Sequence, residues 1–98
     1  MIRVPDIAGR AYAVMGLGAS GLMAAEALAA SGARVRAWDD MPRARDAASA
    51  RGIPLADPAA DGFAGAEALV LSPGIPHTFP APHPAAARAI AEGIPVIC

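Results

Sequence analysis

The sequence predicts a single α/β domain with a Rossmann-like fold, in which helices cover both faces of a parallel sheet of about five strands. Short apolar runs alternate along the chain with longer segments of helical periodicity. A glycine-rich segment, residues 16–21, joins the first apolar run to the first helical segment. The length of 98 residues suits one such three-layer domain.

The first strand and the first helix are expected on either side of the glycine-rich segment. Residues 11–15 form an uninterrupted apolar run that stops at Gly16, which is typical of a strand buried on both faces. In residues 20–31 the apolar side chains recur at helical spacing. Gly32 stands where a helix usually ends, so we expect the first helix to stop there.

The second strand and the second helix follow directly. Residues 33–38 alternate in polarity, which predicts a strand with Arg34 and Arg36 on a solvated face. Trp38, at the end of this strand, is expected to fill the core. Residues 42–51 predict a helix because they begin with proline, which is favoured in the first helical turn, and are followed by glycine.

The second half of the chain predicts three further elements around short connections. Residues 53–55 are too short and too interrupted by proline for a central strand, so they predict an edge strand. Residues 57–65 predict a loop or a single helical turn, and residues 68–71 predict another buried strand. A helix is expected over 84–92, and residues 95–98 begin a fifth strand.

Right-handed crossovers and a switch point beside the first strand predict the strand order 3-2-1-4-5. In open parallel sheets, ligands bind outside the carboxyl ends of the strands at such a switch point. Three segments are expected at that edge. They are the glycine-rich segment, the pair Asp39-Asp40, and Ser72-Pro73-Gly74-Ile75-Pro76.

The glycine-rich segment is the first candidate binding element. Glycines permit a tight turn and a close backbone approach, and free amides at the start of a helix can hold a phosphate. The candidate ligand contacts are Gly18, Ala19, Ser20 and Gly21. In the alternative interpretation the glycines only make the turn, and Ser20 is the N-cap of the helix.

The acidic pair is the second candidate. Asp39 follows Gly21 by 18 residues, near the spacing of about 20 at which dinucleotide folds place an acid against a ribose. In another family the same acid could accept a hydrogen bond from a base or a sugar. An acid here also favours NAD over NADP, because it would repel a 2′-phosphate. Asp40 has an alternative role, since it stands two residues before Pro42 and could cap the second helix.

The third candidate follows the strand at 68–71. Ser72 offers a hydroxyl, Pro73 stiffens the turn, and Gly74 allows the backbone to approach a ligand. If the predicted strand order is right, this segment faces the glycine-rich segment across a crevice. An ordinary tight turn explains the same residues equally well.

Composition limits the partners and the chemistry. The net charge is -1, so neither a nucleic acid nor a membrane is expected as a partner. No apolar run reaches the length of about 18 residues of a membrane span, and the N-terminus lacks the pattern of a secretory signal. The single cysteine, Cys98, suits a reducing compartment, so we expect a cytoplasmic protein.

No catalytic or metal-binding set is expected. All eight basic residues are arginine, so the chain cannot supply the lysine of a phosphate-binding P-loop. His77 and His83 lie in a proline-rich stretch without neighbouring cysteines or carboxylates, which indicates loop solvation or helix capping rather than metal ligation.

Taken together, the motifs resemble the N-terminal domain of the bacterial Mur ligases, specifically those that add D-glutamate to a peptidoglycan precursor. The resemblance covers nearly the whole chain. It is carried by Val4-Pro5-Asp6-Ile7-Ala8-Gly9-Arg10, Gly16-Leu17-Gly18-Ala19-Ser20-Gly21, Trp38-Asp39-Asp40 and Leu71-Ser72-Pro73-Gly74-Ile75-Pro76. The glycine motif alone is unspecific. Its combination with the Ser-Pro-Gly-Ile-Pro segment at this distance is fairly specific.

The resemblance implies that the domain binds the UDP part of UDP-N-acetylmuramoyl-L-alanine. It implies the diphosphate near Gly18 to Gly21, the uracil against Asp39 and Asp40, and Ser72, Pro73 and Gly74 along the opposite wall. Relatives often carry a hydroxyl or amide residue at the position of Asp40, so a second acid here departs from the family pattern.

The resemblance also implies that the reaction takes place elsewhere in a longer parent enzyme. That enzyme uses ATP and Mg²⁺, bound in a central domain, and a third domain that holds the amino acid. The 98 residues are therefore expected to be an excised binding domain without turnover of its own. Two alternatives stay open: the NAD-binding half of a dehydrogenase, and a regulatory domain that senses a nucleotide.

Overall fold

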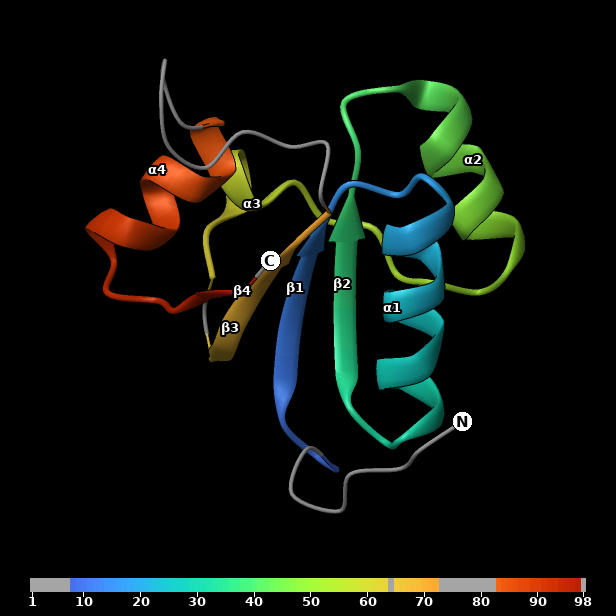
Figure 1. The fold of residues 1–98 in the computed structure, drawn as a ribbon, viewed down its shortest axis with the longest axis horizontal. Coiled ribbons are helices and arrows are strands. Elements are labelled where there is room, and N and C mark those ends of the chain that lie inside the picture. Colours follow the sequence, from blue (N-terminus) through green and yellow to red (C-terminus); the bar gives the residue numbers. More distant parts are fainter. Residues whose placement is uncertain (1–7, 64, 73–82, 98) are drawn as a thin grey trace.

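The computed structural model describes residues 8–63, 65–72 and 83–97. They form one α/β domain with a central parallel sheet (Figure 1). The strands are β1 (Ala11–Met15), β2 (Arg34–Trp38), β3 (Ala66–Leu71) and β4 (Val96–Ile97). The helices are α1 (Ala19–Ala30), α2 (Pro42–Ala50), α3 (Pro58–Asp61) and α4 (Pro84–Ala91). The α/β class and the parallel sheet are thus as the sequence predicted.

The three layers follow from the two faces of the sheet. Figure 1 shows α1 and α2 on one side of the sheet and α3 and α4 on the other. Val14 of β1 packs in the core under α1 and α2, whereas its neighbours Ala13 and Met15 pack in the core under α3 and α4. Because β1 is buried on both faces, its sequence is apolar without alternation.

The sheet contains four strands in the order β2-β1-β3-β4, not five in the order 3-2-1-4-5. The predicted edge strand at 53–55 forms only an isolated parallel bridge between Leu55 and Ala37. Pro54 has no N–H to donate, although its carbonyl accepts the Ala37 N–H at 2.9 Å. The side chain of Ile53 is buried in the core under α1 and α2. This segment is therefore held mainly by side-chain burial.

The remaining boundaries differ from the predicted ones by small amounts. Residues 57–65 contain the single helical turn α3, whose first turn is capped by Asp57, an acceptor for the Ala59 N–H at 3.0 Å. Strand β3 begins at Ala66, two residues before the predicted start. The last strand is described over Val96–Ile97, and Cys98 lies outside the described residues. Among the described helices, none is long and apolar enough to span a membrane.

Candidate nucleotide-binding site

The glycine-rich segment forms a tight turn between β1 and α1 that only glycine permits at two points. Gly16 has a φ of 98°, a left-handed conformation that side chains disfavour. A Cβ atom on Gly21 would stand 1.7 Å from the carbonyl oxygen of Gly16. The Gly16 N–H also donates to the carbonyl of Trp38 at 2.8 Å, which ties the turn to the end of β2. The course of the turn is therefore fixed by its own backbone.

The turn ends in the open N-terminus of α1. Gly18 is the N-cap, and among the described residues no side chain caps the helix. The proposed capping role of Ser20 is therefore wrong, because the helix already begins at Ala19. Gly18, Ala19 and Ser20 are exposed, and the first turn holds no acidic residue. The amides of a first helical turn have no partner within the helix, so this end of α1 favours an anion.

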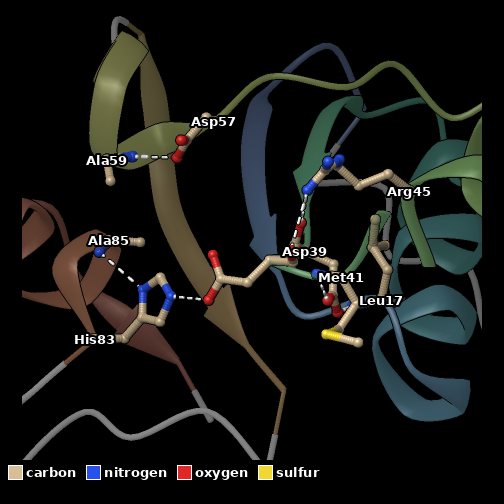
Figure 2. Close-up of polar contacts among 9 residues, drawn as sticks. Leu17, Asp39, Met41, Arg45, Asp57, Ala59, His83 and Ala85 are labelled. Carbon is tan, nitrogen blue, oxygen red and sulfur yellow. Dashed lines mark hydrogen bonds and ion pairs between the residues drawn. The ribbon is translucent and has the colours of Figure 1, made fainter. Parts of the chain in front are cut away.

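The carboxylate of Asp39 supports this turn from the end of β2. Its Oδ2 accepts the Leu17 N–H at 2.7 Å, and its Oδ1 accepts the Met41 N–H at 2.8 Å (Figure 2). Asp39 therefore joins the glycine turn to the beginning of α2. Each carboxylate oxygen retains a second lone pair, so a ligand donor could still be accepted. Sequence reasoning missed this contact, because 22 residues separate Asp39 from Leu17 and no local pattern links them.

Asp40 does not cap α2. The N-cap of that helix is Met41, and the part of the chain that the structure describes supplies no side-chain cap there. The Asp40 carboxylate instead meets His83, with Oδ2 lying 2.6 Å from Nε2. His83 is the N-cap of α4, and its Nδ1 accepts the Ala85 N–H at 3.0 Å. Helix capping was one of the two roles expected for His83, and it is confirmed.

Arg45 was not predicted as part of this region. From α2 its Nη1 donates to the carbonyl of Asp39 at 2.9 Å and to that of Asp40 at 3.2 Å. The guanidinium carbon lies 4.5 Å from the centroid of the Trp38 ring, in cation–π contact. Arg45 therefore holds the backbone of the acidic pair. The available signal was an arginine one helical turn into the helix that follows two acids.

Ser72 lies beside the glycine turn, at the carboxyl end of β3. Its N–H donates to the carbonyl of Met15 at 2.9 Å. The position of a Cβ atom on Gly21 would be 3.6 Å from the Cβ of Ser72. A cleft of about 220 Å³ runs between them, lined by Val14, Ser20, Gly21, Ala24, Val70, Leu71 and Ser72. Pro73, Gly74, Ile75, Pro76 and His77 lie outside the described residues.

The site therefore offers amides and hydroxyls on one side and carboxylates on the other. The amides at the start of α1 and the hydroxyls of Ser20 and Ser72 suit an anionic group. Asp39 and Asp40 suit a neutral group that donates hydrogen bonds. Within the ranges 8–63, 65–72 and 83–97, no three His, Cys, Asp or Glu residues gather into a potential metal site. Such an arrangement can bind and orient a ligand.

Solved structures with similar folds confirm the architecture. Shikimate dehydrogenase from Aquifex aeolicus matches with a TM-score of 0.73 and 12% identity, over 96% of this chain and 44% of that chain. Dipicolinate synthase from Bacillus halodurans matches through one of its chains with a TM-score of 0.68 and 19% identity, over 94% of this chain and 38% of that chain. At such identities the likeness concerns the fold alone. The fold and the site define a Rossmann-like α/β domain with a glycine-rich turn at its ligand edge.

The family is narrower than that class. Residues 10–98 match the family model of the Mur ligase MurD-like N-terminal domain, and the chain belongs to this family. UDP-N-acetylmuramoylalanine–D-glutamate ligase from Paramagnetospirillum magneticum is 50% identical over 98 residues, which are 100% of this chain and 21% of the relative. The enzyme of the same name from Cereibacter sphaeroides strain KD131 is 52% identical over 97 residues, 98% of this chain and 21% of the relative. The chain thus spans about a fifth of the length of the curated relatives it matches.

Proposed function

We propose that the chain is the substrate-binding domain of a UDP-N-acetylmuramoylalanine–D-glutamate ligase and binds the UDP portion of UDP-N-acetylmuramoyl-L-alanine. Support comes from the family match over residues 10–98 and from the names of the relatives. The whole of residues 1–98 is then one domain of a longer enzyme.

The observation that carries the proposal is the meeting of three segments at one edge of the sheet. The open N-terminus of α1 and the cleft beside Ser72 would receive the diphosphate, through Gly18 to Gly21. Asp39 and Asp40, at the end of β2, would face the uracil. Pro73 and Gly74 are proposed for the wall next to Ser72, although they lie outside the described residues.

The reaction itself is proposed for other parts of the parent enzyme. ATP, with Mg²⁺, would activate the substrate carboxylate as an acyl phosphate, which the amine of D-glutamate then attacks. The residues present do not fit the ATP phosphates of such an enzyme, since the chain has no lysine for a phosphate loop. The domain would thus contribute binding and orientation to peptidoglycan synthesis in the cytoplasm, and no chemical step.

The proposal is tested by isothermal titration calorimetry of the 98-residue chain with UDP-N-acetylmuramoyl-L-alanine, UDP and NAD in parallel. We expect heat from both uridine ligands and none from NAD. Binding of NAD without any response to the uridine ligands would establish the alternative, a dinucleotide-binding domain. No binding of any of the three would show that the chain alone lacks the proposed function.

A further inference from the structure

A side-chain contact joins the two halves of the domain above the ligand edge. Nε2 of His83, at the start of α4, lies 2.6 Å from Oδ2 of Asp40, at the end of β2. The two residues are 43 positions apart in the sequence. The side chain of His83 is 12% exposed and that of Asp40 is 63% exposed. A well-packed imidazole therefore holds a carboxylate that would otherwise move freely in solvent.

The backbone of α4 fixes which nitrogen of His83 carries the proton. Nδ1 accepts the N–H of Ala85 at 3.0 Å, so it must present a lone pair (Figure 2). In the neutral ring the proton is then on Nε2, which donates it to the Asp40 carboxylate. The cap of α4 thus orients the imidazole, and the imidazole orients the carboxylate. The same order of support is found where a histidine is oriented by a second group behind it.

We propose that His83 is a positioning residue for the nucleobase contact of Asp40. Oδ2 of Asp40 is engaged by His83, which leaves Oδ1 directed to accept an N–H from a ligand. The ligand chemistry is that of a pyrimidine with an imide N–H, so this inference rests on the proposed uridine site. The neighbouring charged groups have other partners: Asp39 accepts two backbone N–H groups, and Arg45 binds two backbone carbonyls.

The expected contribution of His83 is preorganisation. Without it, the exposed Asp40 side chain would have to be immobilised by the ligand at the time of binding. Immobilising one such side chain corresponds to an affinity loss of about three- to tenfold. His83 itself need not touch the ligand.

The test uses His83→Asn, Asp40→Ala and the double variant, each titrated with UDP by calorimetry. Asparagine is among the preferred N-cap residues, so α4 keeps its cap, but its side chain is too short to reach Asp40. We expect His83→Asn to weaken UDP binding about three- to tenfold. In the double variant, the affinity should equal that of Asp40→Ala. Asp46→Ala, an exposed acid on α2, serves as the matched control and should bind normally.

Three outcomes would overturn the positioning role. His83→Asn could bind UDP as tightly as the unsubstituted chain, or its loss could persist in full when Asp40 is already alanine. The third is an ¹⁵N NMR spectrum of the imidazole without a proton on Nε2. The proposed uridine site has its own separate test, because it fails only if the unsubstituted chain does not bind UDP. In that case the role assigned to His83 fails with it, whatever the NMR spectrum shows of the ligand-free contact.

Discussion

The carboxylate of Asp39 accepts the backbone N–H of Leu17 at 2.7 Å, so the end of β2 directly supports the turn that leaves β1. The second oxygen accepts the Met41 N–H at 2.8 Å. An acid expected for a ligand contact is therefore also a structural residue. The consequence is that its substitution should affect stability as well as binding.

Asp39→Asn is expected to destabilise the domain. The amide has one acceptor oxygen, and its NH₂ group would face the second backbone N–H, leaving that donor unsatisfied. The cost of such an unsatisfied group is about 1–3 kcal/mol in the free energy of unfolding. Circular dichroism melting curves should show a Tm lower by roughly 4–8 °C for each kcal/mol. Asp46→Asn, on the exposed surface of α2, should remain within about 0.5 kcal/mol of the unsubstituted chain.

Alanine at Asp39 should weaken UDP binding more than alanine at Asp40. The first substitution removes both a candidate ligand contact and the support of Leu17, whereas the second removes only an exposed carboxylate and its contact with His83. Calorimetric titrations below the melting temperature of each variant measure the difference. Equal losses, or a greater loss for Asp40→Ala, would show that the two acids have been assigned to the wrong roles.

Gly21→Ala and Gly18→Ala should separate folding from binding. Alanine at Gly21 places Cβ 1.7 Å from the Gly16 carbonyl oxygen, and the backbone cannot yield without opening the turn. The expected cost is about 4 kcal/mol or more, enough to unfold a marginal domain.

The position of a Cβ atom on Gly18 is free of any atom of the described residues within 4 Å, and its φ of -65° suits alanine. Gly18→Ala should therefore melt within a few degrees of the unsubstituted chain. If a diphosphate approaches the backbone there, the new methyl group should still reduce UDP affinity, by at least about tenfold, or 1.4 kcal/mol. Unchanged affinity would place the phosphates away from Gly18.

Arg45→Ala should alter both stability and the fluorescence of Trp38, the only tryptophan of the chain. The substitution removes two hydrogen bonds to backbone carbonyls and the cation–π contact, for an expected loss of about 1–2 kcal/mol. Urea denaturation followed by tryptophan emission reports both effects. Arg43→Ala, an exposed arginine on the same helix, is the control. If both variants show the same emission and midpoint, the contact of Arg45 with the ring contributes nothing measurable.

Local patterns in the sequence predicted the elements well, because burial and helix termination depend on neighbouring residues. The apolar run 11–15 and the proline that opens α4 are examples. The edge strand at 53–55 was wrong, since the burial of Ile53 satisfies this segment without a ladder of hydrogen bonds. The edge position of Ser72 followed from the topology of a parallel sheet.

The polar contacts of the site were beyond local patterns. Asp40 stands at a spacing that suits a helix cap, yet its carboxylate meets His83, 43 residues away. Which of several possible acceptors a backbone N–H finds depends on the folded approach of distant segments. For that reason the support of Leu17 by Asp39 could not be derived from the spacing of the two residues.

The placement of β1 between two separate cores has a consequence for the glycine turn that follows it. Val14 is anchored among the side chains beneath α1 and α2, and Met15, the next residue, among those beneath α3 and α4. The last two residues before Gly16 are thus held from opposite sides, as a rod is held in a vice. A packing defect in either layer would tilt the strand, so substitutions far from the ligand edge should register as misalignment of the turn before they register as unfolding.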